Sequence, residues 1–339
     1  MNTNAQEKRR VLLPALGAAT VIAAFLAAGL LLLDPAYRDI AAGLLSAALA
    51  SFVFALMVLL VFRRRNVLTG IVKFCLIFAF NLTLFTAAGI WWFGPVAIFH
   101  PNRDASSEAM LASMPQVERI EEDGGRLSGW RYHGGGEGAP VILFFYGNGE
   151  TGSAKLRTLC ENVRAGYFAG FDLAVFDYPG YGGAPGRPTE ETVKETALAA
   201  YDYLRRTDDV IGVCGYSIGT GPANYVAANR ETAALALIAP YADGYDLYNN
   251  FLPVFRSPLL RGLVSFKMES RVFAKSVKVT PLVIASADDR TVPLASSEAL
   301  ASCYQNATLQ RRDGRSHAGL PADPVCLGMV SDYFREAFS

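Results

Sequence analysis

Residues 210–221 read Val-Ile-Gly-Val-Cys-Gly-Tyr-Ser-Ile-Gly-Thr-Gly. The apolar start predicts a buried strand, and the residues from Thr220 onward predict a helix. Gly-x-Ser-x-Gly, with Ser217 at its centre, lies between them and is typical of a sharp turn that exposes a serine hydroxyl. Glycine at 215 and 219 removes side chains that would collide with the neighbouring strand and helix. The alternative is a glycine-rich turn that carries a serine by chance, so partners elsewhere must decide.

Short apolar runs alternate with amphipathic stretches around this turn. The predicted strands are 117–120, 129–132, 141–146, 173–176, 210–214, 234–238, 281–285 and 307–310, and the predicted helices are 154–165, 190–205, 220–228, 294–302 and 324–338. Asp123-Gly-Gly125 predicts a hairpin between the first two strands. This alternation predicts an α/β fold, with a mostly parallel central sheet covered by helices on both faces. Ligands of such sheets bind at the carboxyl ends of the strands.

A serine nucleophile needs a base to accept its proton, and the chain has only three histidines, at 100, 133 and 317. Folds with this serine turn supply the triad in the order Ser, acid, His. His317 is the only histidine after Ser217, and it lies between the last predicted strand and the last predicted helix. We therefore expect His317 to be the base, the alternative being an ordinary surface-loop histidine.

The acid that orients this base is expected after the strand 281–285, where Asp288 and Asp289 are adjacent. The partner of the imidazole is expected to be buried and held by backbone donors, and its neighbour to cap the loop or face solvent. Loop capping is a common role for either aspartate alone. Asp243 and Asp246, after the strand 234–238, are further candidates.

Two backbone N–H groups are needed to stabilise the developing oxyanion. Ile218, the residue after the serine, is one candidate. The second is Asn148, in the turn Tyr146-Gly-Asn-Gly-Glu150 that follows the strand 141–146. Asn-Gly is also a strong turn dipeptide, so this loop taken alone is better explained as a plain connection. Its place one strand–helix unit before the glycine-rich serine turn favours the functional role.

The composition indicates a membrane protein without a metal or nucleic-acid site. Of 339 residues, 52% are hydrophobic, and 31 basic residues balance 31 acidic ones. The mean hydropathy of +0.24 is high for a soluble chain. Zero net charge gives no sign of nucleic-acid binding. The five cysteines show no Cys-x-x-Cys spacing and no nearby histidine cluster, so we expect no metal site. We expect no organic cofactor either.

Three apolar runs, 11–33, 40–62 and 67–93, are long enough to cross a bilayer and predict a membrane domain over residues 1–98. Lys73 and Asn81 weaken the third run. The alternatives are a signal peptide at the first run, or two spans. Basic residues precede the first run and follow the second as Arg63–Arg65, so three spans would deliver residues 99–339 to the non-cytoplasmic (periplasmic or extracellular) side of the membrane. With two spans, residues 99–339 would stay on the cytoplasmic side.

The segment at about 240–275 is too long for a simple crossover and is rich in aromatic residues and leucine. Its place in the chain predicts a cap over the site. An apolar cap on a membrane-tethered domain favours a small amphipathic acyl substrate, with the lipid bilayer as the other partner. Alternatively, these aromatic residues only pack the cap onto the core.

At this level of detail the chain resembles the α/β-hydrolase superfamily, and within it the membrane-anchored serine hydrolases related to monoacylglycerol lipases, palmitoyl-protein thioesterases and serine aminopeptidase-like proteins. The matching pieces are Phe144-Phe-Tyr-Gly-Asn-Gly149, Phe176-Asp-Tyr-Pro-Gly-Tyr-Gly-Gly183, Gly186-Arg-Pro-Thr-Glu190, Gly215-Tyr-Ser-Ile-Gly219, Ser286-Ala-Asp-Asp-Arg-Thr-Val-Pro293 and Gly314-Arg-Ser-His317. The resemblance covers most of residues 100–339. Tyr146, Ala184 and Ser286 depart from the family pattern, which bears on the substrate class.

The resemblance implies Ser217 as nucleophile, Asp289 as acid and His317 as base, with Asn148 and Ile218 as oxyanion donors. Asp289 is chosen over its neighbour because it matches the aspartate four residues before the proline. We therefore expect a membrane-anchored serine hydrolase that cleaves an acyl ester or thioester. The alternatives are a serine peptidase or amidase of the same fold, and a catalytically inactive membrane scaffold.

Overall fold

The computed structural model describes residues 38–61, 66–251, 261–262 and 264–339. The chain divides into two compact units. Residues up to Val96, together with Gly262–Ser265, form the first, and Ala97–Arg261 with Phe266–Ser339 forms the second. The division falls two residues before the domain boundary expected from the sequence.

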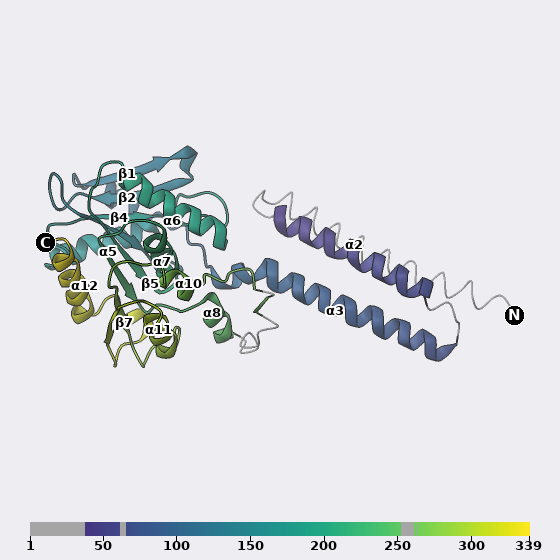
Figure 1. Cartoon of the computed structure of the whole chain (residues 1–339). Coiled ribbons are helices and arrows are strands. Elements are labelled where there is room, and N and C mark those ends of the chain that lie inside the picture. The colour runs from purple at the N-terminus through teal and green to yellow at the C-terminus, as the bar shows by residue number, and fades with distance from the viewer. Residues whose placement is uncertain (1–37, 62–65, 252–260, 263) are drawn as a thin grey trace. The chain divides into compact units, whose positions relative to one another are not determined.

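The described residues of the first unit form two long helices, α2 (Arg38–Val61) and α3 (Val67–Ile98) (Figure 1). The rings of Phe54 and Phe80 stack with centroids 3.9 Å apart. The Ser51 hydroxyl donates to the side-chain oxygen of Asn81, whose amide nitrogen donates to the Ile77 carbonyl. These contacts pair the two helices and give the polar Asn81 side chain hydrogen-bond partners inside an apolar surface, where an unpaired amide would be costly.

Among the described residues one helix, Leu68–Gly89 in α3, is long and apolar enough to cross a membrane. It falls inside the third predicted span. The second predicted span is helical as α2, and the apolar part of this helix within the described residues is the shorter stretch Leu45–Val58. The first predicted span, 11–33, lies outside the described residues.

The second unit is built on an eight-stranded sheet in the order β1-β2-β4-β3-β5-β6-β7-β8. The strands are β1 (Val117–Glu122), β2 (Leu127–Tyr132), β3 (Val141–Phe145), β4 (Asp172–Phe176), β5 (Ile211–Tyr216), β6 (Ala234–Ile238), β7 (Leu282–Ala285) and β8 (Thr308–Arg311). The predicted hairpin forms: β1 pairs antiparallel with β2, and β2 with β4. From β4 to β8 every neighbouring pair is parallel.

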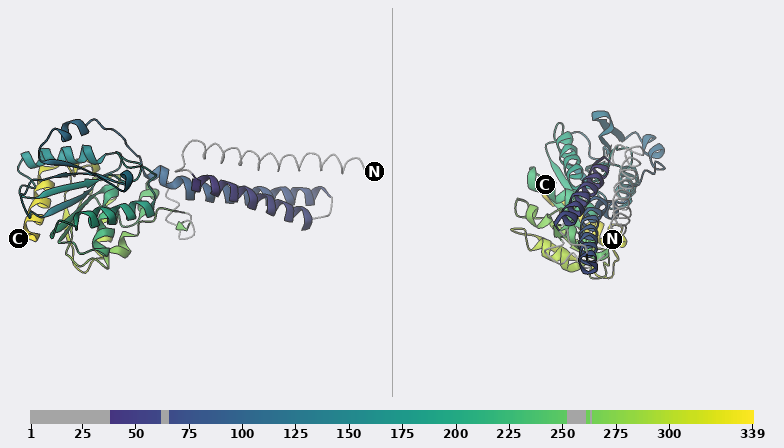
Figure 2. Two further views of the ribbon diagram at one scale, coloured as in Figure 1. Left: turned by 90° about the horizontal axis from the view of Figure 1, so that it is seen from above. Right: turned by 90° about the vertical axis from the view of Figure 1, so that its right-hand side faces the viewer.

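Helices cover both faces of this sheet (Figure 2). The helices whose bounds the structure describes in this unit are α4 (Glu108–Ala112), α5 (Gly152–Arg164), α6 (Glu190–Leu204), α7 (Thr220–Asn229), α8 (Gly244–Phe251), α10 (Ser270–Ala274), α11 (Leu294–Ala301) and α12 (Pro324–Ala337). Successive residues of a strand point to opposite faces. A Cβ placed on Gly212 would meet Phe334 of α12 and Phe338 just after it, and one on Gly215 would meet Ala223 of α7. These two helices therefore lie on opposite faces of β5.

The predicted α/β fold is confirmed, and the predicted strands and helices lie close to the observed ones. Helix α5 begins two residues earlier than expected because the Thr151 hydroxyl accepts the Ala154 N–H and caps it. The described part of the predicted cap segment includes the short helices α8 and α10, which the sequence pattern did not resolve. The residues 252–260 and 263 between them lie outside the described part of the chain.

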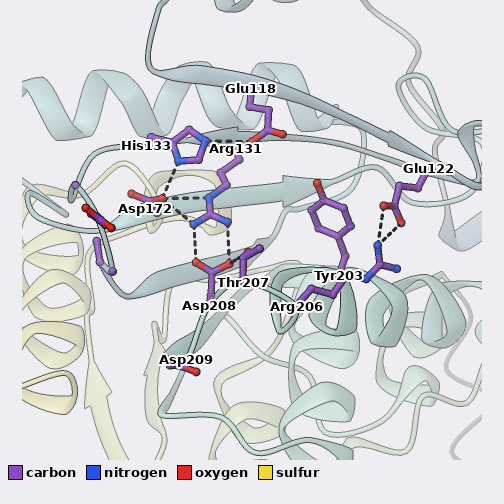
Figure 3. A pocket seen from close by; sticks show the side chains of 14 residues that line it. Glu118, Glu122, Arg131, His133, Asp172, Tyr203, Arg206, Thr207, Asp208 and Asp209 are labelled. Carbon is purple, nitrogen blue, oxygen red and sulfur yellow. Dashed lines mark hydrogen bonds and ion pairs between the residues drawn. The ribbon is translucent and has the colours of Figure 1, made fainter.

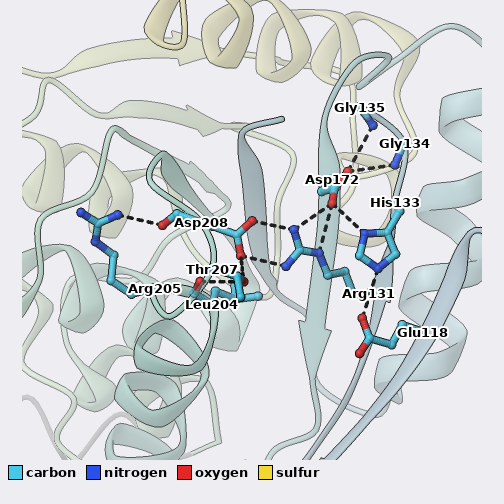
Figure 4. Close-up of polar contacts among 10 residues, drawn as sticks. All are labelled: Glu118, Arg131, His133, Gly134, Gly135, Asp172, Leu204, Arg205, Thr207 and Asp208. Atoms are coloured by element: carbon cyan, nitrogen blue, oxygen red, sulfur yellow. Dashed lines mark hydrogen bonds and ion pairs between the residues drawn. The ribbon is translucent and has the colours of Figure 1, made fainter. Parts of the chain in front are cut away.

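A buried ion cluster occupies the edge of the sheet where the parallel strands begin (Figure 4). Arg131, at the end of β2, bonds Asp172 at 2.8 Å and Asp208 at 2.5 Å, and all three side chains are at most 11% exposed. The other oxygen of Asp172 accepts the N–H groups of Gly134 and Gly135. The cluster joins β2, the start of β4 and the turn before β5, so it fixes three segments that are distant in sequence.

This ion cluster borders a cavity of about 580 Å³ (Figure 3). At its rim Arg206 bonds both oxygens of Glu122. The Arg206 and Glu122 side chains are 60% and 37% exposed. Because the cavity lies at the amino ends of the parallel strands, it is at the opposite end of the sheet from Ser217.

We expect Arg131→Ala to lower the free energy of unfolding by about 3–5 kcal/mol, because it leaves two buried carboxylates without their charge partner. Arg206→Ala is the matched control, and we expect at most about 1 kcal/mol there because the pair it breaks is exposed. Thermal melting of the detergent-solubilised protein measures both. Equal shifts for the two variants would contradict this assignment.

Candidate active site

Ser217 lies at the carboxyl end of β5, in the short 3-10 turn Ser217–Gly219 that leads into α7. Its backbone φ is +55°, a left-handed conformation that a non-glycine residue rarely adopts. A Cβ on Gly219 would lie 2.2 Å from the Phe145 carbonyl oxygen, and one on Gly215 2.7 Å from the Gly219 carbonyl oxygen. Glycine at both positions therefore allows the strained turn that presents the serine.

Three side chains from three loops form one hydrogen-bonded row at this edge. The Ser217 hydroxyl lies 2.7 Å from His317 Nε2, and His317 Nδ1 lies 2.6 Å from Asp289 Oδ2. A carboxylate only accepts, so Nδ1 carries the imidazole proton and Nε2 is left to accept from the serine hydroxyl. Asp289 follows β7, and His317 opens the 3-10 turn His317–Gly319 after β8. The Asp289 side chain is 1% exposed and that of His317 16%.

The two adjacent aspartates have different surroundings. Asp289 is buried, and its Oδ1 accepts the N–H groups of Thr291 and Val292 at 2.8 and 2.9 Å. Asp288 is exposed and accepts the Gly314 N–H. Backbone donors thus orient one carboxylate toward the imidazole, whereas the other closes the loop that carries it.

The other two acidic candidates are engaged elsewhere. Asp243 pairs with Arg271 at 2.8 Å, and Asp246 accepts the hydroxyl of Ser296. The structure therefore brings Ser217, His317 and Asp289 together, and holds these two aspartates in the segment after β6.

Tyr216, the residue before the serine, supports the histidine loop. Its hydroxyl donates to the His317 carbonyl at 3.1 Å, and its ring centroid lies 5.2 Å from that of His317. Sequence reasoning missed this residue because it occupies a variable position of the Gly-x-Ser-x-Gly pattern, where the pattern predicts nothing about its contacts.

The two expected oxyanion donors lie on neighbouring loops. Ile218 directly follows the serine, and its carbonyl accepts the Tyr241 hydroxyl. Asn148 follows β3, which pairs with β5 so that Phe145 is opposite Gly215. The side-chain amide of Asn148 already bonds to groups outside its loop. The backbone N–H of Asn148 is therefore the group of this residue that can donate a hydrogen bond to an oxyanion.

The Asn148 loop is also held from the inside. The Gly147 N–H donates to Glu150, which pairs with the buried Lys155 at 3.2 Å. Tyr146, which departs from the family pattern, donates its hydroxyl to Asp177 at 3.2 Å. Burial raises the pKa of Asp177.

Asp177 connects the loops after β3 and β4 beside the site. Besides the Tyr146 hydroxyl, it accepts the N–H groups of Gly152 at 2.7 Å and Gly183 at 3.2 Å. A Cβ on Gly182 would lie 2.3 Å from this carboxyl group, and Gly182 itself has φ of +48°. Glycine in the stretch after β4 therefore leaves room for the buried carboxyl group of Asp177. The resemblance alone did not indicate this role.

Asp243 gives a pH-dependent contribution to stability. Burial raises its pKa to about 6, although Arg271 partly opposes the shift. An acid whose folded pKa lies above its unfolded value of about 3.9 destabilises the fold once ionised, so stability falls as pH rises from about 4 to 6.

We therefore expect Asp243→Asn to raise the melting temperature by a few degrees at pH 8 and to give no gain at pH 4. Melting curves at the two pH values measure this. A gain of the same size at both would show that ionisation of Asp243 is not the cause.

The sheet order, the strained serine turn and the Ser217–His317–Asp289 row are those of one class of protein, and the chain belongs to the α/β-hydrolase superfamily. No family model matches it. An uncharacterized protein of Mycobacterium tuberculosis is 34% identical over 203 residues, which cover 58% of this chain and 69% of that protein. Human Protein ABHD12B is 27% identical over 230 residues, covering 60% of this chain and 62% of the relative.

Lysophosphatidylserine lipase ABHD12 of Gallus gallus is 28% identical over 177 residues, or 47% of this chain. The chain spans 45% of that relative's length. Among solved structures, the Pyrococcus furiosus esterase Pf2001 superposes with a TM-score of 0.57 at 16% identity, covering 71% of this chain and 98% of the esterase. Est1E from Butyrivibrio proteoclasticus gives 0.53 at 17% identity, covering 66% and 99%. At these identities the two structures show the shared fold.

Proposed function

We propose that this protein is a membrane-anchored serine hydrolase that cleaves an acyl ester or thioester through an acyl-enzyme on Ser217. The chain is an enzyme of the esterase and lipase type. The observation that carries the proposed mechanism is the row of two short hydrogen bonds from the Ser217 hydroxyl through His317 to the buried Asp289.

In the first step the Ser217 oxygen attacks the acyl carbonyl, and His317 Nε2 takes the hydroxyl proton. Asp289 holds the imidazole in the required tautomer and stabilises the imidazolium that forms. The backbone N–H groups of Ile218 and Asn148 bind the oxygen that becomes negative. The imidazolium then gives its proton to the leaving alcohol or thiol as the carbonyl re-forms on the acyl-enzyme.

In the second step His317 accepts a proton from water, and the resulting attack on the acyl-enzyme passes through the same oxyanion. Collapse of that intermediate releases the acid and returns the proton to Ser217. Both steps use the same base and the same pair of N–H donors, so a change to either group slows acylation and deacylation together.

Two observations support a lipid-like acyl substrate. Helix α3 is apolar enough to lie in a bilayer, which would hold the hydrolase unit near membrane lipids. A relative over 47% of this chain is named a lysophosphatidylserine lipase. We infer a small amphipathic ester with one acyl chain, such as a lysophospholipid. The predicted cap, at about 240–275, would contact that chain.

For the membrane part we propose three spans, with the hydrolase unit on the non-cytoplasmic side. The basic residues at 8–10 and 63–65 support this orientation through the positive-inside rule. A membrane-impermeant fluorophosphonate should then label the protein in intact cells. Labelling only after lysis would favour two spans and a cytoplasmic hydrolase unit.

The proposed activity is tested by the turnover of the full chain in detergent. Substrates are p-nitrophenyl esters with short, medium and long acyl chains, the matching thioesters and anilides, and a lysophospholipid. We expect turnover of the esters, little turnover of the anilides, and a preference for longer chains. A preference for the anilides would support a peptidase or amidase, and no turnover of any substrate would contradict the proposal.

A further inference from the structure

We propose that the seven residues leaving helix α3, Ile98–Asp104, position the oxyanion loop, residues 147–151, and so set the geometry of catalysis. We call these seven residues the linker segment. The inference rests on the proposed function, because it assigns the loop a part in stabilising an oxyanion. It adds a group of positioning residues that the motifs of the family do not contain.

Asn148 is the main point of attachment. Its Nδ2 donates to the Ile98 carbonyl at 2.5 Å and to His100 Nδ1 at 3.3 Å. Its Oδ1 accepts the His100 N–H at 2.8 Å and the Tyr181 hydroxyl at 2.7 Å. Both protons and both lone pairs of the amide are therefore used. The side chain of Asn148 cannot rotate without breaking several of these bonds, so the backbone N–H of the same residue is held in place.

The linker segment makes further bonds to the same loop. Asn102 Nδ2 donates to the Gly149 carbonyl at 2.8 Å, and the Thr151 hydroxyl donates to the Asp104 carbonyl at 3.4 Å. The contacts thus extend from Asn148 to the residue that caps α5. Asn148, Gly149 and Thr151 of this loop therefore each bond to the linker segment.

A second loop beside the site is bound by the linker segment as well. The Gly182 N–H donates to the Asn102 carbonyl at 2.8 Å, and Arg103 Nε donates to the Gly180 carbonyl at 3.1 Å. Tyr181, between these two glycines, is the residue that donates to Asn148. The loops after β3 and β4 are therefore joined on the outside by the linker segment, as they are joined on the inside by Asp177.

The linker segment is itself anchored. Ile98 and Phe99 are 4% and 2% exposed, and the Phe99 ring packs edge-on against Phe266 with centroids 5.0 Å apart. Ile98 is also the last residue of α3. The residue that accepts from Asn148 therefore ends the apolar helix, and the position of that helix end is coupled to the position of the oxyanion loop.

Such coupling matters because oxyanion donors act through geometry. A donor must meet the oxygen of the tetrahedral intermediate at about 2.7–3.1 Å, and loss of one donor costs about a hundredfold to a thousandfold in kcat. We expect a donor that is displaced, but still present, to cause a smaller loss of kcat. The ground-state carbonyl is bound almost equally well in either case, so we expect the effect in kcat rather than in KM.

The test is Asn102→Asp in the full chain in detergent. The variant keeps the side-chain oxygen that accepts the Asp104 N–H, and replaces the N–H donor to Gly149 by an oxygen that repels the Gly149 carbonyl. We expect kcat on a p-nitrophenyl ester to fall about tenfold or more, with KM changed less than about twofold. Asn102→Ala removes the donor without adding repulsion and also removes the oxygen that accepts the Asp104 N–H, so its kcat should likewise fall below that of the wild type.

Asn229→Asp is the matched control. Asn229 Nδ2 also donates to a backbone carbonyl at 2.8 Å, that of Tyr225, but at the far end of α7 from Ser217. We expect its kcat to equal that of the wild type. Tyr181→Phe removes one bond to Asn148 and leaves the ring in place, and should lower kcat without a matching loss of melting temperature.

The outcomes separate this inference from the proposed function. If the wild type turns over the ester and Asn102→Asp has an unchanged kcat, or if kcat falls only in step with the melting temperature, the positioning role is wrong and the hydrolase stands. If Ser217→Ala is as active as the wild type, the proposed function fails instead. A kcat loss in Asn102→Asp and Tyr181→Phe, with the melting temperature held, supports the inference.

Discussion

Ser217→Ala is expected to lower kcat for ester hydrolysis by about a million-fold, because the residues of a triad act as one unit and loss of the nucleophile removes the acyl-enzyme route. Some turnover above the rate in water should remain, since the oxyanion donors and the binding surface stay intact. Steady-state kinetics on a p-nitrophenyl ester measures the loss, and labelling by a fluorophosphonate should disappear with it.

Ser302→Ala is the matched control for this experiment. Ser302 is exposed at the end of α11, and its hydroxyl donates to the Ala299 carbonyl. The control should keep full activity and full labelling. Labelling of Ser217→Ala at the level of the wild type would show that another residue is the nucleophile, and would refute the assignment of Ser217.

Asp289→Asn should lower kcat by about ten thousand-fold while leaving the fold intact. The backbone N–H groups of Thr291 and Val292 hold Oδ1, so the amide oxygen of the variant must take that place and the NH₂ group must face His317. The imidazole then accepts at Nδ1 and carries its proton on Nε2, where it can no longer take the proton of Ser217. The loss is therefore one of tautomer and charge, not of packing.

Asp288→Asn provides the matched control one residue away. Its side-chain oxygen can still accept the Gly314 N–H, and the residue is exposed. We expect kcat within about twofold of the wild type, since surface changes away from the reacting groups have small effects. A larger loss in Asp288→Asn than in Asp289→Asn would reverse the assignment of the acid. Melting curves of both variants should match the wild type within a few degrees.

The fold could be predicted from the sequence because its signals are local. The run into Gly-x-Ser-x-Gly specifies a strand, a strained turn and a helix within a dozen residues, and the order of strands and helices does the rest. Asp289 could be predicted as the partner of His317 because it matches the family's aspartate four residues before a proline, here Pro293. From the residues alone it was not separable from Asp288, because the difference lies in burial and in which backbone N–H groups face each carboxylate.

The supports of the site were not predictable, because they join residues far apart in sequence. Asn148 bonds to Ile98 and His100 across about fifty positions, and no local pattern connects them. Likewise the Asp177 contacts to Gly152 and Gly183 depend on how two loops approach each other in space. The short helices of the segment after β6 were missed because they are five and eight residues long, too short for a periodic signal.

The ion cluster of Arg131, Asp172 and Asp208 has a consequence for how this scaffold can change. The cluster stabilises the sheet at the amino ends of its parallel strands. Its charges take no part in the chemistry at the carboxyl ends, where Ser217 lies. The loops that contact the substrate can therefore be exchanged, by evolution or by engineering, while the ion cluster at the opposite end keeps the strands in register. Substrate selectivity and the stability of the fold therefore depend on different ends of the same sheet.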